Sequence, residues 1–352
     1  MSGQRYLSLD VLRGLTVALM IVVNTPGSWE HVYAPLLHAQ WHGFTPTDWV
    51  FPTFLFVVGN ALAFRVPSLG KVARRSAIIF LLGLALCWLP VLGAPLADLR
   101  LLGVLQRIGL CFGLAALVLQ AGGTRGALLF CVLALLGHWL VLAQFGDLTL
   151  AGNAALKVDA WLLGERHLYR GEGLPFDPEG LLGTLPATVN VIAGYFAGRQ
   201  LLEQGEAGKW GTSPFNSLAR MAACGAVLVV LALAWSLLLP VNKKLWTGSY
   251  VLLTIGLDLL VLPLLVYLIE WRGWRGWTYF FEVFGKNTLF IYLLSEVVVI
   301  VMDKAGWYAP LAAKLAPLGP PKAASLVFAL LFMLACWLVG YALDKRRIYI
   351  KV

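Results

Sequence analysis

Charged residues are scarce in this sequence. They make up 13% of its 352 residues, whereas about 25% is usual in soluble globular domains. Hydrophobic residues make up 60%, and the mean hydropathy is +0.80. One soluble core cannot bury so much apolar surface, so the composition excludes a soluble globular protein. It indicates an integral membrane protein whose solvent is the lipid bilayer.

Cysteines and metal-binding motifs are also sparse. The five cysteines fall in separate apolar stretches without a CxxC pair, at Cys87, Cys111, Cys131, Cys224 and Cys336. This pattern predicts small core residues, and it excludes a disulfide framework or a cysteine metal site. The histidines show no HExxH spacing, so we expect no metal cofactor.

Long apolar runs dominate what is present. A spanning helix needs roughly 20 apolar residues, and the sequence holds about ten such runs. They are 8–25, 47–64, 75–92, 101–120, 126–145, 181–199, 217–239, 248–269, 280–301 and 323–343. We therefore predict an all-α, polytopic helical bundle with about ten transmembrane helices, organised as a single domain over residues 1–352.

Basic residues collect on one side of the membrane if the predicted spans alternate. They are Arg5, Arg65, Lys71, Arg74, Arg75, Arg125, Arg199, Lys209, Arg272, Arg275, Lys345, Arg346, Arg347 and Lys351. The positive-inside rule makes this side cytoplasmic, and it places both termini there. A basic rim beside anionic lipid also accounts for the net charge of +9, so no nucleic-acid partner is expected.

Polar residues gather in the outer hairpin 26–46, between the first two predicted spans. It contains His31, His38 and His42. Histidine is the one side chain whose ordinary pKa lies near neutrality, and a membrane boundary gives little reason to keep several unless one is used. We take His38 as the residue of proton or acyl chemistry and interpret the other two as solvated loop histidines.

Two residues beside this hairpin have two interpretations each. Asn24 ends the first span, either as a helix cap or as a donor to a developing oxyanion. Asp48 lies in the first turn of the second span, where an acid suits the helix dipole; alternatively it orients an imidazole. Asp10 and Arg13 share a face of the first span and predict a structural ion pair.

Cations in the outer half of the chain suggest an anion site. Lys243 and Lys244 lie in an outer loop, where topology does not favour them. Arg107 lies about two turns inside the fourth span and is expected to face the interior with a partner. Together with Arg100, near the outer end of that span, these residues predict an outward-opening basic pocket that suits a phosphate.

The longest polar stretch, 146–180, lies on the outer side between the fifth and sixth spans. A loop of this length is usually functional. Its polar side chains suit the hydroxyl and amine groups of a sugar, and we select Asp159, His167, Asp177 and Glu179 as candidate substrate-binding residues. We expect loops 26–46 and 146–180 to line the site.

Isolated polar groups also occur inside the later spans. They are Asn190, Asp258, Glu282, Asn287 and Glu296. Each is costly in hydrocarbon and is therefore expected to face the interior, as contacts between helices or to substrate.

Several segments together resemble one family. In chain order they are SLDVLRG, VVN, HAQWHGFTPTDWVFPTFLFVVG, LQRIGL, VDAWLLGERHLY, FDPEGLLGTLPA, NKKLWTGSY and GKNTLFIY. They resemble the transmembrane heparan-alpha-glucosaminide N-acetyltransferase family, most closely its bacterial NagX-type members. The lysosomal members have an additional N-terminal luminal part and first span, and we expect this chain to match the shared core of about ten helices.

The resemblance implies transfer of an acetyl group from acetyl-CoA to the amine of a terminal glucosamine. It implies that His38 is essential, that Asn24 lies beside it, and that Arg107 and the NKKLW segment contact CoA. Within that segment the candidates are Lys243, Lys244 and Trp246. It also implies a multi-pass protein of the bacterial inner membrane. One departure is His42, where the lysosomal enzyme has asparagine.

The expected chemistry needs a base, because an amine is protonated at neutral pH and must lose a proton to attack a thioester. His38 either takes that proton directly while Asn24 stabilises the oxyanion, or becomes acetylated itself. Two alternatives stay open: an amino-sugar transporter or permease, against which the lack of evident repeats argues, and an acyltransferase to a hydroxyl of an envelope glycan. The oligomeric state, including a homo-oligomer, is also open.

Overall fold

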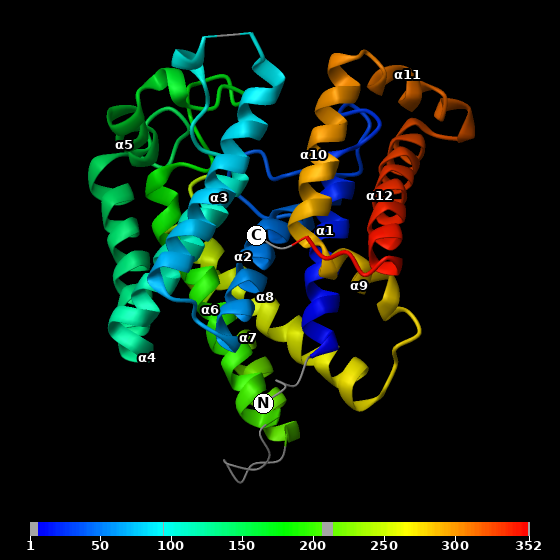
Figure 1. Cartoon of the computed structure of the whole chain (residues 1–352). Helices are drawn as coiled ribbons and strands as arrows, with labels where there is room; N and C mark the ends of the chain where they lie inside the picture. Colours follow the sequence, from blue (N-terminus) through cyan, green and yellow to red (C-terminus); the bar gives the residue numbers. More distant parts are fainter. Residues whose placement is uncertain (1–5, 94, 206–213, 351–352) are drawn as a thin grey trace. The chain divides into compact units, whose positions relative to one another are not determined.

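The computed structural model describes residues 6–93, 95–205 and 214–350, which form helices and no strand. The α-helices are α1 (Leu7–Asn24), α2 (Pro46–Phe64), α3 (Leu69–Trp88), α4 (Val104–Phe145), α5 (Ala154–Leu163), α6 (Leu181–Gly205), α7 (Pro214–Trp235), α8 (Gly248–Val266), α9 (Thr278–Lys286), α10 (Thr288–Lys304), α11 (Tyr308–Ala313) and α12 (Pro321–Lys345) (Figure 1). A π-helical segment, η5 (Tyr267–Trp271), continues α8. Three of the predicted cytoplasmic cations, Arg5, Lys209 and Lys351, lie outside the described residues.

Eight helices within these ranges are long and apolar enough to cross a membrane. They are α1, α2, α3, α4, α6, α7, α8 with η5, and α12. The bent pair of α9 and α10 makes a ninth if it counts as one span. The prediction of an all-helical, polytopic membrane protein is therefore confirmed, because lipid leaves the backbone no other way to satisfy its polar groups than helices or closed barrels.

Helix α4 accounts for two of the predicted runs. Its 42 residues would extend about 63 Å at the helical rise of about 1.5 Å per residue, roughly twice the hydrocarbon thickness of a bilayer. Gly123 interrupts it with φ 55°. A Cβ built on Gly126 would lie 3.9 Å from the carbonyl oxygen of Val118, so the chain reverses here. The two halves correspond to the predicted runs 101–120 and 126–145.

The predicted run 280–301 corresponds to two helices that pass together as one bent candidate span. α9 and α10 meet at Asn287 with a bend of 83°. The Asn287 side chain bonds to the C-terminal segment instead of continuing the helix: its Nδ2 donates to Ile348 O at 3.1 Å, and its Oδ1 accepts from Ile350 N at 2.8 Å. These bonds hold the bend.

The described chain divides into two compact units. Unit 1 includes Gln40–Phe44 and Leu55–Pro263, and unit 2 includes residues 6–39, Thr45–Phe54 and residues 264–350. The chain therefore passes between the units twice in the predicted outer hairpin, once within α2 and once within α8. The prediction of a single domain stays a prediction.

Glycines let helices approach closely within each unit. In unit 2, a side chain at Gly14 of α1 would overlap the carbonyl of Phe281 in α9. In unit 1, a side chain at Gly59 of α2 would overlap the carbonyl of Val191 in α6. Small residues at such crossings are typical of membrane helices, whose association depends on close packing.

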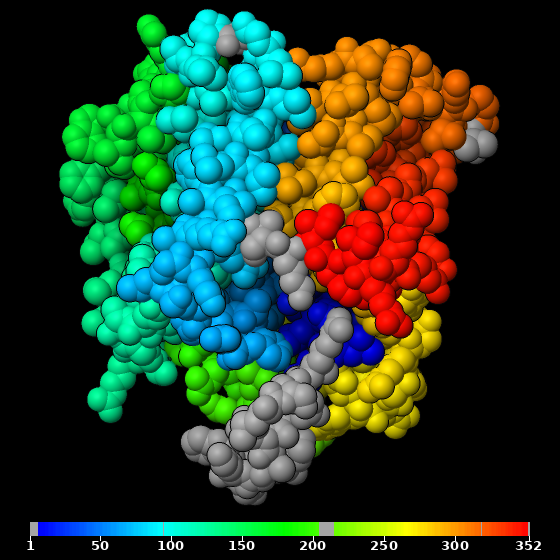
Figure 2. Space-filling model, viewed as in Figure 1, coloured from blue at the N-terminus to red at the C-terminus, as the bar shows by residue number. Residues whose placement is uncertain are grey.

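The helices differ in how far they are covered. In its apolar window α3 is only 17% buried and α12 28%, whereas α1 is 72% and α6 78% buried. Figure 2 shows α3 in light blue and α12 in red, with their side chains on the surface. The poorly covered helices provide the apolar faces that lipid requires.

Polar side chains inside the spans behave largely as expected. Asn190 and Asp258 are fully buried and Asn287 is nearly so, which confirms that they face the interior, whereas Glu282 and Glu296 are partly exposed. The predicted ion pair of the first span is also confirmed: Arg13 Nη1 lies 3.2 Å from Asp10 Oδ1 in unit 2.

The close crossing of α2 and α6 predicts the effect of a single methyl group. Gly59→Ala should lower the unfolding free energy by about 1–3 kcal/mol, the usual cost of overpacking. The control Gly70→Ala, at a position with no atom within 4 Å, should cost nothing because alanine favours the helix. Thermal unfolding in one detergent measures both variants, and equal midpoints would contradict the packing assignment.

Candidate active site

The first part of the outer hairpin is anchored to other elements of unit 2. Gly27 N donates to Ser325 O at 3.1 Å, and Ser28 N donates to Ser325 Oγ at 3.1 Å, at the start of α12. The hydroxyl of Tyr308 in α11 donates to Pro26 O at 2.8 Å. These bonds satisfy backbone groups left over where α1 ends, and they fix the start of the segment that leads to His38.

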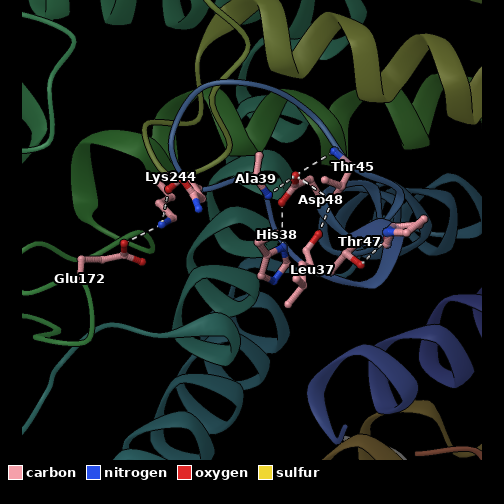
Figure 3. A network of polar contacts seen from close by, with 10 residues as sticks. Leu37, His38, Ala39, Thr45, Thr47, Asp48, Glu172 and Lys244 are labelled. Carbon is pink, nitrogen blue, oxygen red and sulfur yellow. Dashed lines mark hydrogen bonds and ion pairs between the residues drawn. The ribbon is translucent and has the colours of Figure 1, made fainter. Parts of the chain in front are cut away.

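His38 and Asp48 form the main polar contact of the hairpin. His38 Nδ1 lies 2.7 Å from Asp48 Oδ1, and the Asp48 side chain is 1% exposed while that of His38 is 44% exposed. Figure 3 shows this pair with its neighbours. A carboxylate that accepts from Nδ1–H selects the tautomer whose Nε2 carries the lone pair, so the arrangement suits a base or a nucleophile.

The second oxygen of Asp48 holds the hairpin backbone. Asp48 Oδ2 accepts from Ala39 N at 3.1 Å, from Thr45 N at 3.0 Å and from Thr45 Oγ1 at 3.1 Å. Both sequence interpretations of Asp48 therefore apply, because it lies in the first turn of α2 and also orients the imidazole. The carboxylate joins the residue after His38 to the start of the helix.

Asn24 finds its partner elsewhere in unit 2. Its Nδ2 donates to Glu296 Oε1 at 3.2 Å, joining the end of α1 to α10. The expected position of Asn24 beside His38 stays a prediction. In the sequence, Glu296 is one of several isolated polar groups, and nothing in the pattern indicates this partner.

The middle of the hairpin, Gln40–Phe44, is anchored in unit 1. Trp41 Nε1 donates to Leu148 O at 2.7 Å. Asn242 Nδ2 contacts His42 Nδ1 at 3.3 Å, and partial burial lowers the pKa of His42. His42 is exposed, as we expected of a solvated loop histidine, and its ring also contacts a neighbouring loop.

Lys244 also holds this segment. Its Nζ donates to Gln40 O at 2.7 Å and forms an ion pair with Glu172 (Figure 3). Glu172 lies in the loop 146–180 and was not among our predicted residues. The charge of this lysine is thus already compensated within unit 1.

Arg107 is buried as predicted and is incompletely satisfied. It is 1% exposed, its Nη2 donates to Gly180 O at 2.9 Å, and its guanidinium carbon lies 4.8 Å from the centre of a Trp246 ring. Neither Nε nor Nη1 of Arg107 has a hydrogen-bond partner in the described part of the chain. Buried donors of this kind are costly, so they mark a place where an anion would be stabilised.

Trp246, whose ring contacts Arg107, has a strained backbone conformation. It is fully buried, and its Nε1 donates to Asn190 Oδ1 at 3.2 Å. Its φ of 54° lies in the left-handed region, which costs a bulky residue about 1–3 kcal/mol. The strained backbone of Trp246 therefore occurs at the residue whose ring contacts Arg107.

Arg100 is neutralised, which differs from the basic pocket that we predicted. Its Nη2 lies 2.8 Å from Asp177 Oδ1 and 2.7 Å from Glu179 Oε2, and the Tyr169 ring lies under the guanidinium. Burial raises the pKa of Asp177. Burial opposes ionisation of Glu179 too, but the charges of Arg100, Arg107 and Lys243 lower its pKa overall.

The other two predicted substrate residues also have internal partners. Asp159 Oδ1 accepts from Leu181 N at 3.0 Å and from Leu182 N at 3.4 Å at the start of α6, and burial raises the pKa of Asp159 to about 6. His167 Nδ1 donates to Leu99 O at 2.7 Å. The Asp159 bonds join α5 to the start of α6, and the His167 bond joins the loop to the segment before α4.

The described ranges 6–93, 95–205 and 214–350 bring together no three His, Cys, Asp or Glu side chains in a geometry for a metal. Unit 2 thus holds a histidine–carboxylate pair, and unit 1 holds a buried arginine with unpaired donors. The helices themselves define the class of the protein: a polytopic helical membrane protein.

The chain belongs to the family described as heparan-alpha-glucosaminide N-acetyltransferase, catalytic, whose model matches residues 5–228. The human heparan-alpha-glucosaminide N-acetyltransferase is 28% identical over 360 residues, covering 83% of this chain and 53% of the relative. The mouse protein of the same name is 26% identical over 413 residues, covering 100% of this chain and 61% of the relative.

The chain therefore spans between half and two thirds of the length of these curated relatives. The family resemblance in the sequence is confirmed, and with it the class of membrane N-acetyltransferases. The matched range contains His38, Asp48 and Arg107 and ends before Lys243 and Glu296.

The pairing of Arg100 predicts a structural role for its carboxylate partners. Asp177→Asn should lower the unfolding free energy by about 1–3 kcal/mol, because it removes a buried carboxylate from a partly buried guanidinium. Thermal unfolding measures this loss. The control Asp303→Asn, at an exposed position in α10, should leave the midpoint unchanged; an unchanged midpoint for Asp177→Asn would show that the contact does not stabilise unit 1.

Proposed function

We propose that this protein transfers the acetyl group of acetyl-CoA to the amine of glucosamine or of a terminal glucosaminide. The observation that carries the proposal is the 2.7 Å contact between His38 and the buried Asp48. Family membership supports the reaction class, since the matched relatives are named for N-acetyl transfer to heparan-alpha-glucosaminide. The acceptor of this chain belongs to the proposal.

His38 acts as the base in this reaction. Asp48 holds the Nδ1 side of the ring, so Nε2 takes the proton that the acceptor amine loses during attack. In the two-step version of the reaction, the same nitrogen attacks the thioester carbonyl and CoA leaves as its thiolate; the amine then attacks the acetylated imidazole, forms the amide and releases the ring. Asp48 stabilises the cationic imidazole in both versions.

Acetyl-CoA would supply the acetyl group as an activated thioester. Arg107 fits its anionic part, because two buried guanidinium nitrogens lack partners in the described structure and a phosphate accepts from such donors. Lys243 is the second cation that we assign to CoA. Lys244 is paired with Glu172 and Trp246 is enclosed, so we assign these two residues to shaping the loop around Arg107.

Four further assignments stay predictions. The first is that four residues bind the acceptor, although each of their side chains already has a partner within the protein: Asp159, His167, Asp177 and Glu179. A lining of the site by loops 26–46 and 146–180 is another. The third is a bacterial inner-membrane location with cytoplasmic termini, and the fourth is a homo-oligomer.

His38→Ala should lower N-acetylation of glucosamine by about 10²- to 10⁴-fold, the range that general bases contribute. The assay follows thiol release together with N-acetylglucosamine formation by the purified protein in detergent. The control is His31→Gln, which changes another histidine of the same hairpin and keeps a hydrogen-bonding group for Ser28. Near-normal activity of a folded His38→Ala would refute the assignment, and sugar uptake into vesicles without acetylation would support a carrier.

Asp48→Asn should lower kcat by a similar factor, up to about 10⁴-fold as in other histidine–carboxylate pairs. The asparagine side chain no longer favours the tautomer with an unprotonated Nε2. The measurement is the pH–rate profile, in which the variant should lose rate across the neutral range. An unchanged profile would show that the carboxylate serves the hairpin backbone alone.

A further inference from the structure

The contact between Asn24 and Glu296 joins two residues that are 272 positions apart in the sequence. Asn24 is the last residue of α1, and Glu296 lies in the middle of α10. Asn24 Nδ2 donates to Glu296 Oε1 at 3.2 Å. Both residues belong to unit 2, so the contact is internal to that unit.

A carboxylate at this position is electrostatically expensive. Glu296 lies in an apolar helix that forms part of a candidate membrane span, where ionisable groups are rare and usually functional. It also approaches the C-terminal end of α1, where the helix dipole disfavours negative charge. An apolar side chain would connect the two helices at lower cost, so contact between the helices alone does not explain a hydrogen-bond acceptor at this position.

The bend before α10 directs this helix toward α1. The 83° bend at Asn287 separates α10 from α9, and the bonds from Asn287 to Ile348 and Ile350 hold that bend. α10 then packs against α1. The bend and the packing of α10 against α1 place Glu296 beside Asn24.

The contact determines how the Asn24 amide is oriented. A carboxylate oxygen can only accept, so it requires the Nδ2 side of Asn24 and turns Oδ1 away. One N–H is used by Glu296, and the amide nitrogen carries a second N–H. An amide held in this way presents one donor and one acceptor in fixed directions, which is the preorganisation that catalysis by hydrogen bonding needs.

We propose that Glu296 is a positioning residue that acts through Asn24 by holding its side-chain amide in one orientation for acetyl transfer. This role rests on the proposed function. Asn24 is then the residue that contacts the reacting groups, by its second N–H or its carbonyl oxygen. Glu296 itself neither gains nor loses a proton in the reaction.

A double-mutant cycle tests the coupling. Full-length wild type, Asn24→Ala, Glu296→Ala and the double variant are compared for kcat of glucosamine N-acetylation at saturating acetyl-CoA. Asn24→Ala should lower kcat by about 10²- to 10³-fold and Glu296→Ala by up to about 100-fold, the effect of a misplaced catalytic group. The double variant should equal Asn24→Ala within about twofold, because Glu296 has nothing left to position.

The conservative variant separates positioning from charge. Glu296→Gln keeps a carbonyl oxygen that accepts from Asn24 Nδ2, so it should retain most of the wild-type kcat. A Glu296→Gln variant as slow as Glu296→Ala would overturn the proposal, because the charge itself would then be needed. Multiplicative effects in the double variant, or an unchanged kcat in Glu296→Ala, would overturn it as well.

Two controls make the outcomes distinct. Asp303→Ala removes an exposed carboxylate from the same helix and should leave kcat unchanged. Thermal unfolding checks that each variant folds, and Glu296→Leu, which fills the space but cannot accept, replaces an unfolded Glu296→Ala. If the wild type transfers no acetyl group, both the proposed function and this inference are refuted. If the wild type is active but the Asn24 and Glu296 substitutions act independently, only this inference is refuted.

Discussion

The buried carboxylate of Asp48 is the group on which the hairpin depends. It accepts from the imidazole of His38, from the backbone of Ala39, and from both the backbone and the hydroxyl of Thr45. A carboxylate is stable at such a low exposure only when its oxygens are satisfied. These bonds to Asp48 stabilise its charge, hold the hairpin against α2 and orient the His38 ring. The fold of the hairpin and the orientation of the imidazole therefore depend on the same carboxylate.

The distribution of charge within unit 1 separates structural cations from an available one. Arg100 is matched by Asp177 and Glu179, and Lys244 is matched by Glu172. Arg107 also interacts with the charge of Glu179, but it donates its hydrogen bond to a backbone carbonyl and lies beside an aromatic ring. An aromatic ring and a carbonyl reduce the cost of burying a guanidinium without saturating its donors, and two of the Arg107 nitrogens have no hydrogen-bond partner among the described residues.

The sequence predicted those features that follow from local composition. Run lengths identified the spans, spacing identified the Asp10–Arg13 pair, and depth in a span indicated that Arg107 is buried. Long-range partners could not be predicted in this way, since helical periodicity gives the face of a residue but not the helix that meets it. Arg100 meets carboxylates 77 and 79 positions away, and Glu296 meets Asn24 across 272. The bend at Asn287 was missed for the same reason, because it depends on the distant C-terminal segment.

The reversal at Gly123 has a consequence for the parity of the membrane crossings. If each half of α4 crosses once, and α9 with α10 crosses once as a broken span, the described helices make an even number of passes. An even number returns the chain to the compartment from which it started. The segments at residues 6 and 350 then share one aqueous phase, and without the reversal at Gly123 the number of passes would be odd.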